Sequence, residues 1–169
     1  MSPDVRWPGP HSGPGTSAVT VDFVLRPAVA ADEERLYAIH KAALGEYVEA
    51  TWGWDEAWQR QYFRDHFARE SLQAITVEGQ VVGLLQVGVH PDHIDCVNIE
   101  IAPAWQGRTI GTTVLRRLLE QAILDGHGTV RLQVLKANPR AVRLYQRLGF
   151  VTTGESATHR FMQHQSPAR

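Results

Sequence analysis

Alternating and continuous runs of apolar residues predict seven strands along this chain. We expect them over residues 21–26, 72–78, 81–89, 95–102, 129–135, 150–153 and 159–163. Residues 79–80 form the turn expected for a hairpin between the second and third of these strands. Strands interrupted by helical patterns indicate a sheet packed against helices.

Apolar residues at helical spacing predict four helices between these strands. The expected helices cover residues 32–44, 55–67, 110–125 and 139–148. Asp32 is expected to cap the first helix and Gly45 to end it. Residues 46–54 are aromatic and show no clear period, so we expect an irregular connection there. The second helix is expected to turn its aromatic residues toward the core: Trp58, Tyr62, Phe63 and Phe67.

The resulting order, β-α-α-β-β-β-α-β-α-β-β, predicts one mixed α/β (α+β) domain with a sheet of six to seven strands flanked by helices. We expect this domain over residues 21–164. Residues 1–20 are rich in Pro, Gly and Ser, which predicts a flexible arm. Residues 165–169 are expected to be a short C-terminal tail.

Composition excludes several classes of function. The formal net charge of -1 provides no basic field for nucleic acid, so we expect no nucleic-acid partner. No apolar run reaches the length of a membrane span, and no secretory signal is apparent, so we expect no membrane partner. Cys96 is the single cysteine of the chain, which excludes an internal disulfide and is typical of a cytoplasmic protein.

A glycine-containing turn between a strand and a helix is the first candidate site. The residues Gln106-Gly107-Arg108-Thr109-Ile110-Gly111 follow an apolar run and precede a long helical pattern. The first amides of a helix have no internal partner, and the helix dipole adds positive potential there. This turn is therefore predicted to bind the pyrophosphate of a cofactor.

A second motif lies further along the chain, from Asn138 to Phe150. Asn138 has the residue type of an N-cap, Pro139 suits the first helical position, and Gly149 ends the helix. Tyr145 lies within this helix, where its spacing alone is that of a core aromatic residue.

The two motifs together resemble the GCN5-related N-acetyltransferase (GNAT) superfamily. Its acyl-CoA motif, Gln/Arg-x-x-Gly-x-Gly/Ala, is matched by Gln106–Gly111. Its Asn-x-x-Ala-x-x-Leu-Tyr-x-x-x-Gly-Phe signature is matched by Asn138, Ala141, Leu144, Tyr145, Gly149 and Phe150. Thr109 departs from the family, which has a glycine there. Because threonine resists positive φ, we expect either a negative φ at Thr109 or a shifted loop.

The resemblance implies a single-domain GNAT fold and acetyl-CoA as the cofactor. It implies that backbone groups of Ile99, Glu100 and Ile101 pair with the pantetheine arm, and that Asn138 contacts the same arm. It also implies that Tyr145 lies near the thioester sulfur and protonates the leaving thiolate. The implied cofactor loop comprises Gln106, Gly107, Arg108, Thr109, Ile110, Gly111 and Thr112.

The base that deprotonates the amine stays open between two carboxylates. Asp95 lies where several family members carry a base or a proton relay, and Glu100 is closer to the implied thioester. Strand alternation places Asp95 on the same face as Ile99, and Glu100 on the opposite face. Glu46 is a third, weaker candidate.

The acceptor site is expected between the first two helices and near the last hairpin. Its candidate residues are Glu46, Tyr47, Trp52, Trp54 and His159. His90 and His93 resemble part of a zinc site, but no third ligand is apparent, so we expect a solvated loop and no metal.

These observations predict an acetyl-CoA-dependent N-acetyltransferase that acts on a primary amine of a small molecule through a ternary complex. The alternatives are acetylation of protein N-termini or lysines, and a non-catalytic acyl-CoA sensor. The family fold often dimerises through its late strands, so the resemblance also implies a homodimer as an alternative to a monomer.

Overall fold

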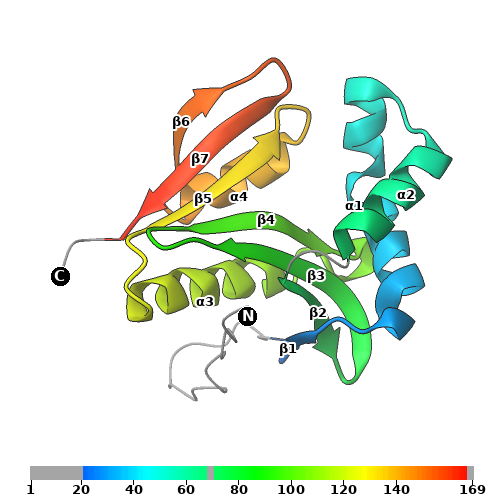
Figure 1. Cartoon of the computed structure of the whole chain (residues 1–169), viewed down its shortest axis with the longest axis horizontal. Helices are drawn as coiled ribbons and strands as arrows, with labels where there is room; N and C mark the ends of the chain where they lie inside the picture. Colours follow the sequence, from blue (N-terminus) through cyan, green and yellow to red (C-terminus); the bar gives the residue numbers. More distant parts are fainter. Residues whose placement is uncertain (1–20, 68–70, 167–169) are drawn as a thin grey trace.

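A seven-stranded mixed sheet organises the chain (Figure 1). The computed structural model describes residues 21–67 and 71–166, so the expected arm at residues 1–20 lies outside the described residues. The sheet order is β1-β2-β3-β4-β5-β7-β6, and only the β4–β5 pair within it is parallel. The strands are β1 (Val24–Pro27), β2 (Ser71–Val77), β3 (Gln80–Val89), β4 (Ile94–Ile101), β5 (Thr129–Leu135), β6 (Val151–Glu155) and β7 (His159–Gln165). The predicted element order and the mixed sheet are therefore confirmed.

Helices cover both faces of this sheet. They are α1 (Glu33–Trp52), α2 (Glu56–Phe67), α3 (Ile110–Leu124) and α4 (Pro139–Arg147), with short 3₁₀ turns η1 (Ala30–Asp32) and η2 (Pro103–Trp105). Residues of α3 and α4 share one large apolar cluster with β5, whereas Leu36 of α1 packs with Leu72 and Leu84 in a separate, smaller cluster. Among residues 21–67 and 71–166, no helix combines the length and the apolar character needed to cross a membrane.

The first helix is longer than its sequence predicted. Gly45 does not end α1, which continues to Trp52 and ends at Gly53, where φ is 81°. The expected irregular stretch at residues 46–54 is therefore largely helical. Glycine disfavours a helix interior by about 1 kcal/mol, but the Trp54 ring packs beside Gly45 in ordinary van der Waals contact. Tertiary packing overrides the local preference.

Asp32 does not cap α1 as expected. Its carboxylate instead accepts two hydrogen bonds from Arg26, at 2.7 and 2.9 Å, and one from the Val29 amide. Asp55 does cap α2, because its Oδ1 accepts from the Trp58 amide at 2.9 Å. The side chains of Asp32 and Arg26 thus join β1 to the start of the helical layer.

The second helix meets the expectation in part: Phe63 and Phe67 pack against the small leucine cluster, but Trp58 and Tyr62 do not enter the core. Trp58 and Tyr62 are 56% and 45% exposed, whereas Gln59 is buried. The rings of Trp58 and Tyr62 stack with centroids 4.9 Å apart. The prediction that both rings enter the core is wrong, because the polar Gln59 occupies the inward position between them.

Two strand boundaries also differ from the predictions. The turn of the β2–β3 hairpin is formed by Glu78 and Gly79 rather than by residues 79–80, and both have positive φ, at 50° and 80°. These angles are those of a type I′ turn, which matches the twist of the flanking strands. β7 continues to Gln165, one residue beyond the predicted end of the domain.

An irregularity in β4 decides which side chains share a face. Gln86 of β3 pairs with Asn98, but the next residue, Val87, pairs with Cys96, so Val97 is an extra residue in a β-bulge. Cys96 lies in the α3-side cluster and Ile99 packs against it, while Asn98 bonds to Gln86 on the other face. The expected alternation along β4 is therefore wrong. Asp95, which pairs with Gly88, and Glu100 lie on the same face, toward α1 and α2.

The same strand separates from β5 after a short contact. Residues 94–96 pair with residues 130–132, and no further β4–β5 pairs exist within the described chain. Figure 1 shows β5, β7 and β6 fanning away from β4 on the side of the sheet near α1 and α2.

Candidate active site

A cavity of about 1350 Å³ lies where β4 and β5 diverge. Val97, Asn98 and Ile99 line it from β4, and residues 131–135 line it from β5. Its remaining walls come from α1, α2, α4, β6 and β7. The cavity therefore joins elements that lie far apart in the sequence.

The start of α4 is fixed by local interactions that position Tyr145 in this cavity. Asn138 is the N-cap, and its side chain accepts a hydrogen bond from the Ala141 amide at 3.1 Å. Pro139 occupies the first helical position, and Gly149 ends the motif with φ at 90°. Asn138 and Tyr145 both line the cavity. The predicted cap and helix end are confirmed.

Tyr145 is a buried phenol. Burial raises its pKa, and the nearby Cys96 and Glu100 raise it further. The hydroxyl therefore stays protonated at neutral pH and is able to donate a proton. Its ring packs edge-to-face on Phe150, with centroids 5.8 Å apart, which holds the side chain in place.

Cys96 borders the same cavity but is not suited to covalent catalysis. It is buried in the apolar cluster, and burial raises the pKa of its thiol to about 12. A cysteine nucleophile acts as the thiolate, which this environment disfavours at neutral pH.

A buried His40–Glu100 pair lies on the α1 side. His40 Nδ1 is 2.9 Å from Glu100 Oε1, and His40 lines the cavity whereas Glu100 lies behind it. Burial alone lowers the pKa of His40, but the charge and hydrogen bond of Glu100, together with Gln59, outweigh burial and raise it. Glu100 Oε2 is buried and has no hydrogen-bond partner among the described residues. A carboxylate behind a histidine is a typical arrangement for moving a proton.

Sequence reasoning missed His40 as a functional residue. Its helical spacing with Leu36 and Ile39 indicated only a core position. The one signal in the sequence that could have identified it is a polar side chain on an otherwise apolar helix face. Its partner, Glu100, lies sixty residues away in the chain, so the pair itself was not visible in the sequence.

The second candidate carboxylate, Asp95, is engaged differently. Asp95 lines the cavity, but its two oxygens lie 3.0 Å from His90 Nε2 and 3.5 Å from His93 Nε2. Its carboxylate is held by two imidazoles at the far end of β4 from Glu100.

The candidate acceptor residues separate into two groups. Trp52 and His159 line the cavity and face each other with ring centroids 5.7 Å apart. Trp58 and Tyr62, expected in the core, line it as well. Glu46, Tyr47 and Trp54 are not among its lining residues.

These three side chains have other surroundings. Glu46 is exposed on α1. Burial raises the pKa of Tyr47, with a further contribution from Glu46. The Trp54 indole donates to Glu56 Oε2 at 2.9 Å and packs at Gly45, which braces α1 against α2.

The turn at residues 106–112 adopts an unexpected backbone. Thr109 has φ of 64° and ψ of 1°, a left-handed conformation, so the first of the two expected alternatives, a negative φ, is wrong. Gly107 is also left-handed, with φ at 75°. Strain at a non-glycine residue of this kind costs on the order of 1–3 kcal/mol and is found at ligand-binding sites.

This turn leads directly into the start of α3. Thr109 is the N-cap, and its carbonyl accepts from the Thr113 amide at 2.9 Å. The amides of Ile110, Gly111 and Thr112 precede this first helical bond and are free to bind an anion. Gly111 lies against Ile101, so the turn adjoins the end of β4.

Side chains fix the same turn from the sides. Gln106 donates to the Ile101 carbonyl at 2.9 Å and accepts from Arg140 of α4 at 3.1 Å. The Arg108 guanidinium lies over the Trp105 ring, 4.7 Å from its centroid. These contacts connect the turn, β4 and α4, the three elements that carry the predicted cofactor residues.

The sequence of this chain is similar to parts of known proteins. Spore coat polysaccharide biosynthesis protein SpsD of Bacillus subtilis is 28% identical over 116 residues, covering 57% of this chain and 40% of that protein. Streptothricin acetyltransferase of Streptomyces lavendulae is 29% identical over 83 residues, covering 48% of this chain and 44% of that protein. The chain thus matches less than half the length of these relatives.

Solved structures share the fold. The paia N-acetyltransferase of Thermoplasma acidophilum, in complex with coenzyme A, superposes with a TM-score of 0.71 at 14% identity. The superposition covers 86% of this chain and 99% of that one. The model of the acetyltransferase (GNAT) family matches residues 34–150, more than half of the chain. The matched region contains both motifs and most of the cavity wall, and the chain belongs to the acetyltransferase (GNAT) family.

Proposed function

We propose that this protein transfers an acetyl group from acetyl-CoA to the primary amine of a small molecule, by direct attack in a ternary complex. The observation that carries the proposal is a single cavity lined by both Tyr145 and His40. Tyr145 is the proposed acid. His40, hydrogen-bonded to Glu100, is the proposed base. Each of the two proton transfers in the reaction is therefore assigned to one side chain.

The donor end of the site is built from the family motifs. The amides of residues 110–112 are available for the pyrophosphate, and Asn138 lies at the cavity wall where the pantetheine arm is expected. Residues 97–99 of β4 have lost β5 as a neighbour, which leaves backbone groups for an extended ligand to pair with. The Thermoplasma relative of the same fold contains coenzyme A.

The proposed chemistry needs an uncharged amine and a protonated leaving group. The amine attacks the thioester carbonyl, a backbone amide near Ile101 orients the oxygen, and the amine proton passes to His40, directly or through water. Tyr145 donates its proton to the departing sulfur. The raised pKa of Tyr145 keeps that proton in place beforehand.

The acceptor end favours a small amine with an apolar or cationic body. Trp52, Trp58 and Tyr62 offer aromatic faces, and the carboxylates of Asp55 and Asp95 also line the cavity. Aromatic faces and carboxylates both attract ammonium groups. The Streptomyces relative is named a streptothricin acetyltransferase, and that name specifies streptothricin rather than a protein as the acceptor.

A thiol-release assay with acetyl-CoA and a panel of amines tests the proposal. The panel contains small primary amines, polyamines, a peptide with a free N-terminus and a lysine peptide. Amine-dependent thiol release with the small amines is the expected result. Preference for the peptides would favour protein acetylation instead. Tight acetyl-CoA binding without amine-dependent release would leave a non-catalytic sensor.

A further inference from the structure

The hairpin that joins β3 to β4 gathers two histidines and an aspartate on one face. The His90 amide donates to the His93 carbonyl at 2.9 Å, so these residues face each other across a tight turn. Directly opposed residues of a hairpin project their side chains to the same side, and Asp95, two residues after His93, projects there too. Gly88, the partner of Asp95, has no side chain, and the His90 ring occupies the space beside it.

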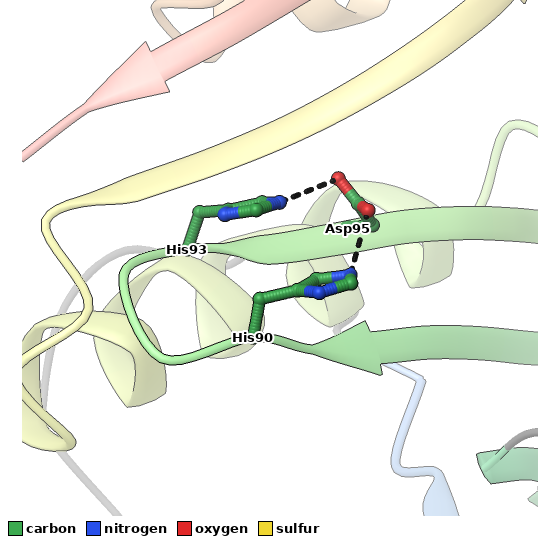
Figure 2. A group of neighbouring side chains, drawn as sticks. All are labelled: His90, His93 and Asp95. Carbon is green, nitrogen blue, oxygen red and sulfur yellow. Dashed lines mark ion pairs between the residues drawn. The ribbon is translucent and has the colours of Figure 1, made fainter.

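The three side chains point their donor atoms at one another (Figure 2). The Nε2 atoms of His90 and His93 lie 3.0 and 3.5 Å from the two oxygens of Asp95, and one donor atom of each residue lies within 4.8 Å of the others. The imidazole rings are stacked, with centroids 4.3 Å apart and planes 8° apart. Tetrahedral bonds of the usual length to zinc hold ligand atoms about 3.4 Å from one another.

A fourth residue completes the arrangement from behind. Asp92 Oδ1 lies 2.8 Å from His93 Nδ1, on the side of the ring that faces away from Asp95. Carboxylates behind metal-bound histidines hold the ring in this way, so Asp92 is placed to orient His93 Nε2 toward a bound ion.

We propose that His90, His93 and Asp95 form a zinc site. Two imidazoles and one carboxylate suit a transition ion such as zinc, whereas magnesium and calcium prefer oxygen ligands. Three protein ligands leave a fourth position for water or another ligand. The sequence suggested only a fragment of such a site, because no third ligand was apparent and Asp95 was considered only as a candidate base.

The position of the site gives it a consequence for catalysis. Asp95 lines the cavity opposite Arg131 of β5, so a bound ion lies at the edge of the acceptor region. A carboxylate bound to zinc is a poor proton acceptor. Metal binding therefore leaves His40 and Glu100 as the base and ties the start of β4 to the hairpin.

Metal binding to tag-free, chelator-treated protein tests this site without any assay of activity. Zinc is titrated in competition with a chromophoric chelator, and cobalt serves as a spectroscopic probe of nitrogen and oxygen ligands. We expect one equivalent to bind, with no competition from excess magnesium. Zinc should also raise the melting temperature, because it binds only the folded chain.

Variants assign the ion to the hairpin. The double variant His90→Ala/His93→Ala should lose at least a hundredfold in zinc affinity, and Asp95→Asn should lose a large part of it. Asp92→Asn should weaken binding by about 10- to 100-fold, the usual effect of removing a carboxylate behind a ligand histidine. His66→Ala, a histidine on α2 outside the cluster, is the matched control and should bind as wild type.

Two results would overturn the proposal. The first is wild-type protein that binds zinc no more tightly than the double variant. The second is a cobalt spectrum that the double variant retains. Circular dichroism of each variant verifies that it is folded, and Asp95→Asn provides a milder change if the double variant does not fold.

Discussion

The two faces of the central sheet differ in what they bury. Against α3 and α4 the sheet buries a large, almost purely apolar cluster that includes Leu115, Leu118 and Leu132. Against α1 and α2 it buries Gln86 and Glu100 beside a small cluster of three leucines.

We therefore expect the apolar face to contribute mainly to stability and the polar face to the proposed chemistry. Burial of apolar side chains stabilises the folded state, whereas burial of a polar group destabilises it unless the group is hydrogen-bonded. The polar face places such groups at and behind the cavity wall, as the His40–Glu100 pair illustrates. Tyr145 connects the two regions, because it belongs to the apolar cluster and also lines the cavity.

The largest expected effect on activity comes from removing the Tyr145 hydroxyl. Tyr145→Phe should lower kcat by about 10²- to 10⁴-fold, the usual contribution of a positioned acid, while the affinity for coenzyme A stays nearly unchanged. Steady-state kinetics and calorimetric titration measure the two quantities. Tyr37→Phe is the matched control, because the Tyr37 hydroxyl bonds to Glu56 between α1 and α2. An unchanged kcat would remove Tyr145 as the acid.

On the apolar face, a substitution should act on stability instead. Leu115→Ala removes a fully buried side chain from α3 and should lower the free energy of unfolding by about 2–5 kcal/mol. Leu124→Ala, at an exposed position of the same helix, should change it by less than about 0.5 kcal/mol. Urea unfolding followed by fluorescence measures both. Equal effects from the two substitutions would contradict the assignment of the core.

On the polar face, Glu100→Gln should shift a pH profile. Glu100 raises the pKa of His40 against the effect of burial, so without its charge the pKa falls. The acidic limb of kcat/KM should therefore move to lower pH, and the rate at its plateau should fall. Asp95→Asn is the competing test: if it alone moves the limb, Asp95 is the base. If neither variant moves it, the amine loses its proton to water or to another group.

The same pair should contribute to stability in a defined pH range. A histidine whose native pKa is raised stabilises the fold fully below its unfolded pKa, about 6.5. That contribution is lost as the pH rises through the native pKa. The difference in unfolding free energy between wild type and Glu100→Gln should therefore shrink from pH 6 upward. A difference that grows with pH would contradict the ion pair.

The smallest expected effect is at the acceptor wall. Trp52→Ala removes the ring that faces His159 and should raise KM for the amine by about two- to tenfold, with KM for the donor unchanged. Adding His159→Ala should cost less in the double variant than in wild type, since the two rings contact one another. Additive effects would mean that the pair does not act together on the acceptor.

Most of the fold was readable from local patterns. The element order, the family, the Asn138 cap and the end of α4 at Gly149 all follow from short stretches of sequence, and the structure confirms them. Predictions failed where side-chain contacts outside the helix itself were not visible in the local pattern. Gly45 lies inside α1 with Trp54 packed beside it, and Asp32 binds Arg26 rather than capping α1.

For the candidate site too, the sequence was informative about local motifs and uninformative about contacts between separate elements. The sequence proposed Tyr145, Asn138 and the turn at residues 106–112 as site candidates, because each belongs to a motif whose spacing is local, and of these Tyr145 and Asn138 line the cavity. It misjudged Thr109, whose left-handed φ shows that the surrounding contacts hold a threonine where glycine is easier. It did not reveal His40, whose significance depends on a carboxylate from another element.

The sequence by itself determined which elements form, in what order, and which family they build. Tertiary structure alone decided how the polar groups of β4 are used. The bulge at Val97 places Asp95 and Glu100 on one face, and there Asp95 meets the two histidines of the hairpin while Glu100 meets His40. The physical reason is that strand alternation is a local rule, whereas a bulge is fixed by the register between two strands and by what packs on them.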